Sequence, residues 1–95
     1  MTPVMDQSDT PELTLFAQPN PFSNQTQLSF TIPIKAHATL EVIDLMGRPV
    51  RTLIRGVLNP GSHEYVLTRE ELADGIYYCR LTVNDRFAYK VISLF

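Results

Sequence analysis

The side chains that could carry out chemistry in this sequence are few and poorly placed for it. His37 and His63 are the two histidines, and neither has the Asp, Glu or Cys spacing that completes a metal site. Glu70 and Glu71 are adjacent, so their carboxyl groups point in different directions, whereas a paired-carboxylate site needs facing groups about 5–10 Å apart. The sequence therefore predicts no metal site and no acid–base pair.

The potential nucleophiles also lack activating neighbours. Cys79 lies among apolar residues, and neither a helix N-terminus nor a basic pattern beside it would lower the pKa of its thiol. No serine stands in a nucleophile-elbow pattern, and the four glycines do not form a phosphate-binding loop. We therefore expect a protein that is not an enzyme and that uses no cofactor.

Length and charge narrow the class of protein further. The chain has 95 residues, 44% of them hydrophobic and 19% charged, which suits one small domain with a single core. Its net charge of −2 gives no basic surface for nucleic acid or for an anionic membrane. A single cysteine excludes an internal disulfide framework, and no apolar run approaches the roughly 18 residues that a membrane span needs.

The elements that must position these side chains are β-strands. From Leu13 onward apolar and polar residues alternate with period two, and turn residues interrupt the alternation about every 8–12 residues. In the fourth strand we expect Val50 and Leu53 to point inward. The predicted fold class is all-β, an immunoglobulin-like antiparallel β-sandwich of about seven strands.

Turn residues mark where the strands end. Gly47 and Gly61 suit tight turns that need a positive φ, and Gly61 follows a proline that presets its turn. An Asn-Asp pair beginning at Asn84 predicts a tight hairpin between the last two strands. Thr68, with Glu71 three residues later, fits a capping box and predicts a single helical turn.

The first 12 residues differ from the rest in composition. They carry Asp6, Asp9 and Glu12 and no basic residue, and they offer little apolar surface to bury. We interpret residues 1–12 as a flexible acidic linker or a cloning remnant, and residues 13–95 as the folded domain. This stretch has neither a basic nor an apolar signal-peptide region, so the signal of an exported protein would lie upstream of this fragment.

Several short motifs in a fixed order carry a resemblance to a known family. They are Pro19-Asn20-Pro21-Phe22, the run at 40–50 with Gly47, the run at 59–63 with Gly61, Leu72-Ala73-Asp74-Gly75-Ile76-Tyr77-Tyr78, and Lys90-Val91-Ile92. Over residues 13–95 the chain resembles the C-terminal sorting domain (type A) of proteins exported by the type IX secretion system of Bacteroidota-type bacteria. It is also similar to the immunoglobulin-like module of flagellar hook-capping proteins.

The resemblance implies a C-terminal secretion signal. The domain would follow a covalently attached cargo and direct it through the periplasm to the outer membrane, for display on the cell surface or for secretion. The outer-membrane machinery would recognise the last two strands, about Asp74 to Phe95, and a surface signal peptidase would cut in the linker before Leu13. The resemblance assigns recognition to Asp74, Gly75, Tyr77, Arg80, Arg86, Lys90, Val91 and Ile92, and a structural motif to Pro19, Asn20, Pro21, Gly47 and Gly61.

Several of these residues also have a physical interpretation. We expect Tyr77 to bury its ring and tie its hydroxyl to a loop backbone, as in the tyrosine corner of antibody domains but without the disulfide. The prolines around Asn20 fix the entry to the first loop. Leu67-Thr68 stands where the family often has Trp-Asp, so that part of the core must be filled differently.

Basic and aromatic side chains near the end of the chain predict a docking surface. Arg80, Arg86 and Lys90 would line it, with Tyr78 and Tyr89 on the same exposed face. A final strand at a sheet edge would also offer backbone groups for strand addition and for an edge-strand homodimer. The alternative is a structural or adhesive module that binds glycan or a partner protein, for which a planar patch of exposed tyrosines would be the sign.

Overall fold

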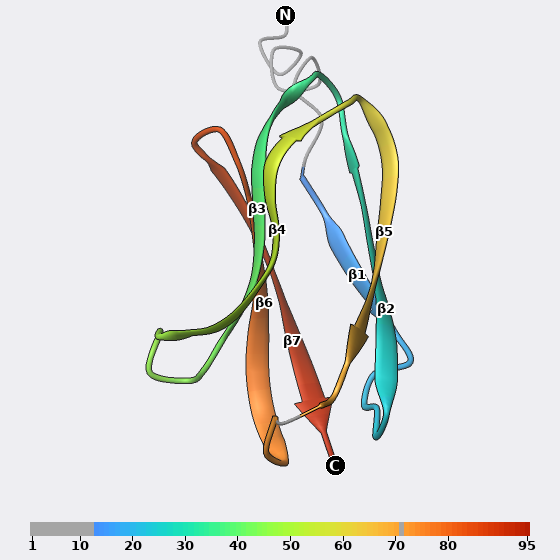
Figure 1. Ribbon diagram of the computed structural model, residues 1–95, viewed down its shortest axis with the longest axis vertical. Coiled ribbons are helices and arrows are strands. Elements are labelled where there is room, and N and C mark those ends of the chain that lie inside the picture. Colours follow the sequence, from blue (N-terminus) through green and yellow to red (C-terminus); the bar gives the residue numbers. More distant parts are fainter. Residues whose placement is uncertain (1–12, 71) are drawn as a thin grey trace, which may run out of the picture.

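The computed structural model describes residues 13–70 and 72–95, which form strands and the loops that join them (Figure 1). The strands are β1 (Leu15–Gln18), β2 (Gln25–Ile32), β3 (Ala36–Ile43), β4 (Pro49–Leu58), β5 (Gly61–Thr68), β6 (Gly75–Val83) and β7 (Arg86–Leu94). They form a three-stranded sheet in the order β1-β2-β5 and a four-stranded sheet in the order β4-β3-β6-β7, both antiparallel. The predicted antiparallel β-sandwich is confirmed.

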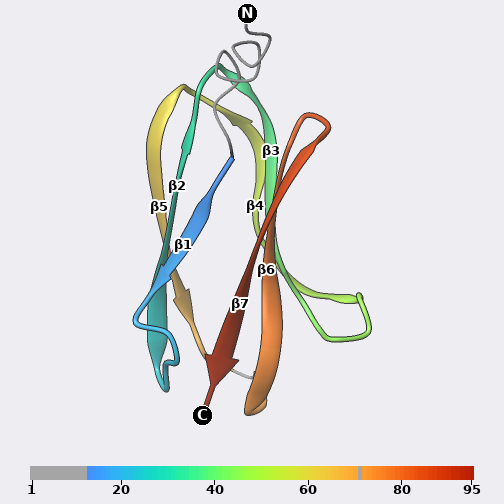
Figure 2. The same ribbon diagram turned by 180° about the vertical axis from the view of Figure 1, so that it is seen from behind.

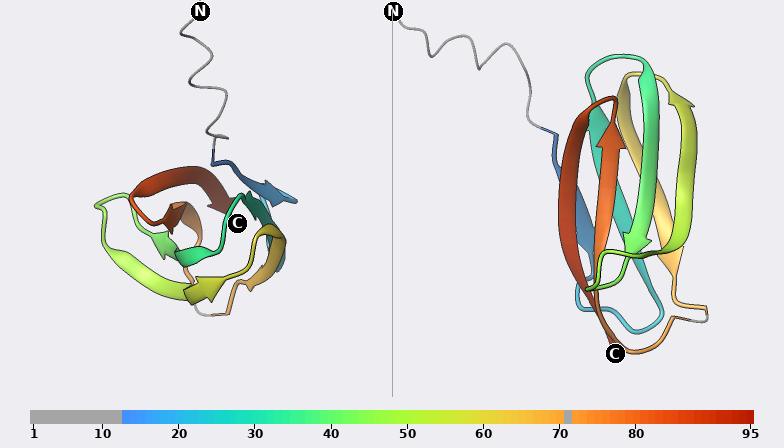
Figure 3. Two further views of the ribbon diagram at one scale, coloured as in Figure 1. Left: turned by 90° about the horizontal axis from the view of Figure 1, so that it is seen from above. Right: turned by 90° about the vertical axis from the view of Figure 1, so that its left-hand side faces the viewer.

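The two sheets pack face to face as two layers, which Figure 3 shows from above and from the side. The chain passes from β4 to β5, and so from one layer to the other, through a turn that ends at Gly61 with a φ of +119°. In a constant-type immunoglobulin sandwich the fourth strand lies in the same sheet as the fifth. Here β4 pairs with β3 instead. Within the described ranges no helix is long and apolar enough to cross a membrane.

Strand alternation sends one row of side chains from each strand into the core. The inward rows include Leu28 on β2, and Leu40 on β3 directly opposite Leu81 on β6. Leu67 on β5 is almost fully buried, so a leucine fills this part of the core. Burying a leucine contributes about 1.5–3 kcal/mol, so this shared apolar layer holds the two sheets together.

β4 follows its partner less regularly than the other strands do. Its pairing with β3 shifts register at two places, once after Leu40 and once after Val42. Leu53 packs against the core as predicted, but Val50 is exposed. The prediction for Val50 is wrong because period two holds only between register shifts, and each shift turns the following side chains to the other face.

The link between β5 and β6 does not contain the expected helical turn in its described part. Thr68 is the last residue of β5, and its hydroxyl donates a hydrogen bond to Glu70 Oε2 at 2.7 Å instead of accepting one from a helical N–H, while Glu71 lies outside the described residues. Two arginines hold the link: Arg51 donates a hydrogen bond to Thr68 O at 2.7 Å, and Arg69 donates to Ser23 O at 3.3 Å. Strand pairing and these arginines satisfy backbone carbonyls without a helix.

Candidate docking surface

The outer side of the four-stranded sheet carries the candidate docking surface. On β6 and β7, residues such as Cys79 and Ile92 point into the core, so the alternate residues point outward. We call the main outward residues of these two strands the β6–β7 outer face; they are Ile76, Tyr78, Arg80, Phe87, Tyr89 and Val91. The strand register places Arg80 opposite Tyr89, and Tyr78 opposite Val91.

Arg80 is fixed in this face by Glu41 on β3. Its Nε and Nη2 atoms donate hydrogen bonds to Glu41 Oε1 at 3.1 and 2.6 Å, and only 8% of Glu41 is exposed. The hydrogen bond to Glu41 is the main reason that the pKa of Arg80 is raised, and a side-chain hydrogen bond with Tyr89 adds to it. A guanidinium group is thereby held beside an aromatic ring, a combination that is common at protein interfaces.

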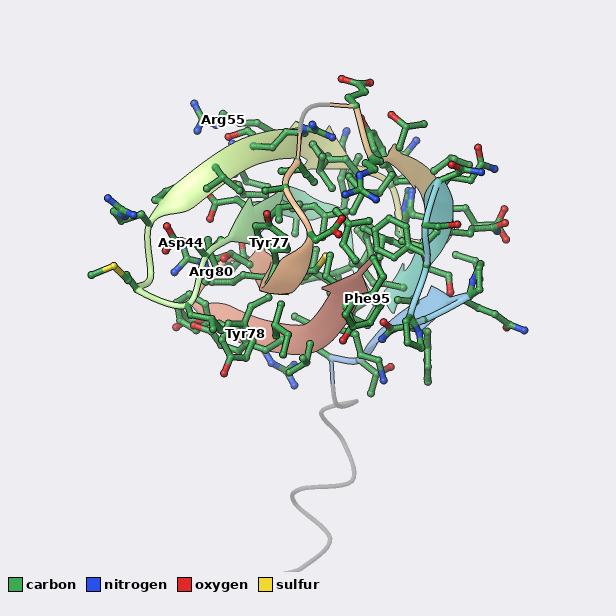
Figure 4. The ribbon with its side chains drawn as sticks, turned by 90° about the horizontal axis from the view of Figure 1, so that it is seen from below. Asp44, Arg55, Tyr77, Tyr78, Arg80 and Phe95 are labelled. Atoms are coloured by element: carbon green, nitrogen blue, oxygen red, sulfur yellow. The ribbon has the colours of Figure 1, made fainter. Side chains whose placement is uncertain are left out.

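Tyr78 and Tyr89 meet edge to face beside this arginine. Their ring centroids lie 6.4 Å apart and their planes meet at 87°, a geometry that stabilises an aromatic pair by about 0.5–1.5 kcal/mol. Tyr89 is still 54% exposed, so much of its ring is open to a partner. In Figure 4, Tyr78 and Arg80 lie on the same side of the molecule as Asp44. The side chains of this face therefore hold one another in place.

Arg86 and Lys90 lie on the other side of the sheet from Arg80. They alternate with the outward residues of β7 and share the inward side with Ile92. The register places Lys90 opposite the buried Cys79. The expectation that the three basic residues line one surface is therefore wrong, because strand alternation turns two of them away from the third.

Asp74, Gly75 and Tyr77 build the start of β6. Asp74 forms an ion pair with Arg69, and Gly75 begins the strand with a φ of +148°, which side chains rarely allow. The Tyr77 hydroxyl donates a hydrogen bond to Ala73 O at 2.7 Å, and the ring packs against the core. The predicted tyrosine contact is confirmed, and its geometry serves to position β6.

The loop between β3 and β4 projects away from the three-stranded sheet (Figure 1). Asp44 Oδ1 accepts hydrogen bonds from Met46 N and Arg48 N, both at 2.9 Å, and Gly47 has the predicted positive φ, +86°. The bond from the Arg48 backbone is the main reason that the pKa of Asp44 lies below its ordinary value. Sequence reasoning missed Asp44, although an aspartate three residues before a glycine is a common turn signal.

Residues 19–22 lie along the free edge of β7, and we call them the Asn20 clamp. Asn20 Nδ2 donates a hydrogen bond to Val91 O at 2.8 Å, and Asn20 Oδ1 accepts one from Ser93 N at 3.0 Å. Phe22 N donates to Ser93 O at 3.0 Å, and Phe95 N donates to Phe22 O at 3.1 Å. Sequence reasoning placed this motif in a loop and missed its contact with the last strand.

His63 and Cys79 occupy structural positions, whereas His37 lies at the surface. His37 is exposed on β3, whereas His63 stacks on Phe30 at 5.5 Å with its Nε2 2.7 Å from Asn59 O. Burial raises the pKa of Cys79 to about 12, which keeps the thiol protonated at neutral pH. Nowhere in residues 13–70 and 72–95 do three His, Cys, Asp or Glu side chains gather as metal ligands would.

The tyrosines do not form the planar patch that a glycan-binding module would show. Tyr65 lies in the three-stranded sheet, half-buried against the core. Tyr78 and Tyr89 share the outer face of the other sheet, but their rings are nearly perpendicular. This geometry gives the glycan-binding alternative no support.

Comparison with known protein families identifies the family of this chain. A family model described as secretion system C-terminal sorting domain matches residues 17–93, which run from β1 into β7. No match is found among curated proteins or among solved structures. The matched stretch contains the β6–β7 outer face, the loop between β3 and β4 and most of the Asn20 clamp contacts. The chain therefore belongs to the C-terminal sorting domains of the type IX secretion system, signals that send an attached cargo to the outer membrane, the cell surface or the medium.

Proposed function

We propose that the type IX machinery recognises the folded domain through the β6–β7 outer face. The observation that carries this proposal is a set of exposed aromatic and aliphatic side chains around an arginine that Glu41 holds in place. Contiguous exposed apolar groups are uncommon on monomeric proteins and often mark interaction sites. Tyrosine and arginine are also the residues that most often carry binding energy at interfaces.

Side-chain docking fits this domain better than strand addition at its edge. The Asn20 clamp already occupies the polar groups of Val91 O and Ser93 N on the free side of β7. The outer face, in contrast, is open and held by its own contacts, so a partner can bind it without moving the backbone. Recognition of the last two strands then rests on Tyr78, Arg80 and Tyr89.

The other steps of the proposal follow the family resemblance. The domain passes through the periplasm with its cargo, and a surface peptidase cuts in the linker before Leu13, after which the cargo is attached to the surface. β1 begins at Leu15, so a cut there leaves the sandwich whole. The domain takes part without catalysis of its own, which is supported by the protonated thiol of Cys79 and the structural contacts of His63.

A reporter protein carrying residues 13–95 at its C-terminus tests the recognition step. Tyr89→Ser removes an exposed anchor and no core contact. Because such an anchor is worth about 2 kcal/mol or more, we expect export to fall by at least about tenfold. The matched control is Phe16→Ser, since Phe16 is a 59% exposed aromatic on the other sheet, and this variant should be exported normally. An equal loss in both variants would contradict the proposal.

Deleting the last strand also tests the recognition step, but less specifically than a point variant does. Truncation after Asn84 removes Ile92 and Leu94, both fully buried, so the chain loses its fold together with its surface. Circular dichroism of the point variants therefore has to show an intact β-sandwich before their export is compared. Normal export of a reporter truncated after Asn84 would still refute the proposal.

A further inference from the structure

β7 is an edge strand, and its backbone groups alternate between its two sides. In an antiparallel ladder, every second residue gives both its N–H and its C=O to the same neighbour. The Asn20 clamp binds Val91 O and Ser93 N, so these two residues face away from β6. The same alternation turns the backbone groups of Phe87 and Tyr89 toward the free edge as well.

The Asn20 clamp covers the C-terminal part of this edge, from Val91 to Phe95, as a neighbouring strand would. The side-chain amide of Asn20 takes the place of a peptide group, because it donates to Val91 O and accepts from Ser93 N. Phe22 then pairs through its own backbone with Ser93 O and Phe95 N. Each outward polar group from Val91 O to Phe95 N has a partner in this way.

The clamp is also anchored by contacts other than its hydrogen bonds to β7. The side chain of Phe22 is buried in the core, and Thr26 Oγ1 donates a hydrogen bond to Pro19 O at 2.6 Å. Pro21 lies between these anchors and has no N–H to offer an incoming strand. Asn20 itself is exposed, so only its amide reaches over the edge.

The N-terminal part of the edge, at Phe87 and Tyr89, is protected in a different way. Among the described residues, the outward backbone groups of Phe87 and Tyr89 make no backbone hydrogen bond, and β1, which contacts β7 (Figure 2), pairs with β2. Arg86 and Lys90 place charge on the inward side of this edge strand. Inward-pointing charges are one of the devices that discourage edge-to-edge pairing.

We propose that the Asn20 clamp is a cover that keeps β7 from pairing with the same strand of a second copy of this chain. An antiparallel pair centred on Tyr89 would set Phe87 opposite Val91 of the other copy. In that register Val91 O must accept a hydrogen bond across the interface, but the clamp already occupies it. Removing the clamp frees that acceptor on both copies and lengthens the open edge to Ser93.

Hydrogen exchange in the unmodified protein tests the cover directly. The N–H groups of Ser93 and Tyr89 face the same edge, but only that of Ser93 is bound by the clamp. We expect Ser93 N–H to exchange at least about tenfold more slowly, after correction for intrinsic rates. Equal rates for these two amides overturn the proposal before any variant is made.

Asn20→Ala should make Ser93 N–H exchange as fast as Tyr89 N–H. The matched control is Asn24→Ala, because Asn24 is an exposed residue of the same loop whose backbone carbonyl accepts from Arg69 N at 2.8 Å. This control should keep the slow exchange at Ser93. Slow exchange at Ser93 in the Asn20→Ala protein shows that the clamp is not the cover.

The oligomeric state tests whether a second copy of this chain pairs with the uncovered edge. By analytical ultracentrifugation, the dimer dissociation constant of Asn20→Ala should be at least roughly tenfold lower than that of the unmodified protein, since two further hydrogen bonds become available. Asn20→Asp keeps the shape but sets a carboxylate oxygen against Val91 O, and it should dimerise in the same way if the alanine variant does not fold. Variants with fast exchange at Ser93 that stay monomeric overturn the proposal. Neither measurement involves the secretion machinery, so its outcome is independent of the proposed recognition step.

Discussion

The two outer faces of the sandwich share one strand pattern but present different side chains. Both sheets send an apolar row inward. On the three-stranded sheet the outward residues of β2 and β5 are mostly polar, namely Gln25, Gln27, Ser29, Thr31, Ser62 and Glu64. On the four-stranded sheet the β6–β7 outer face is mostly aromatic and aliphatic. Folding needs only the inward rows, so the difference between the outer faces points to a partner on one of them.

The ion pair in the apolar face strengthens this conclusion. Glu41 is nearly buried under Arg80, and burying charges is costly unless they are paired. An apolar pair of similar size would stabilise such a sheet at least as well. The pair therefore suits a surface that must present a guanidinium group in a fixed position.

The most disruptive way to test the difference between the faces is to remove Arg80. Arg80→Ala leaves the carboxylate of Glu41 nearly buried without its partner, which should lower the free energy of unfolding by about 2–4 kcal/mol. Arg55→Ala, at an exposed arginine on β4, should change it by less than about 0.5 kcal/mol. Urea unfolding measures both, and equal small effects would show that the outer face is not held by this pair.

A milder change compares one hydroxyl group in each sheet. Tyr77→Phe removes the hydrogen bond to Ala73 O and should cost about 1 kcal/mol, because the carbonyl loses its partner. Tyr65→Phe makes the same change at a half-buried ring of the three-stranded sheet and should be close to neutral. If Tyr65→Phe is as destabilising as Tyr77→Phe in urea unfolding, the start of β6 has no special anchoring.

The smallest effect is expected at Asp44 and depends on pH. Its pKa is lowered in the folded protein, so its ionised form stabilises the fold above the unfolded-state pKa, near 3.8. That stabilisation is lost as the pH falls through the folded-state pKa. Asp44→Asn should therefore be less stable than the unmodified protein at about pH 6, and the difference should shrink toward about pH 2. Thermal unfolding across this range checks the sign; a constant difference would contradict it.

Local patterns were enough to predict most of the fold. The alternation around Leu28 and Leu81 predicts both the strands and their inward sides. Asn84, with a φ of +56°, makes the predicted tight hairpin. The hydroxyl contact of Tyr77 was also predicted correctly, from its likeness to the tyrosine corner of antibody domains.

The errors on the basic residues and on Val50 have different physical origins. The hairpin sets Arg86 opposite Val83, an inward residue, so register alone would have separated Arg86 and Lys90 from Arg80. Grouping these residues by charge ignored the side of the sheet on which the hairpin register places each of them. Val50 could not be placed in this way, since the register shifts that expose it leave no mark in a period-two pattern.

The long-range polar contacts of the candidate site could not be predicted from the sequence. The partners of Asn20 lie 71 and 73 residues further along the chain, and no local period links them. An asparagine between prolines indicates a turn, but nothing in its neighbours indicates which strand its amide will meet.

The Asn20–Ser93 contact also bears on when the β6–β7 outer face forms. A bond that spans 73 residues closes a loop containing almost the whole domain, and contacts of such long range slow folding. The strand that carries Ser93 also supplies Ile92 and Leu94 to the core. Because the last strand completes both the core and the β6–β7 outer face, we expect this face to form only once the whole domain has folded.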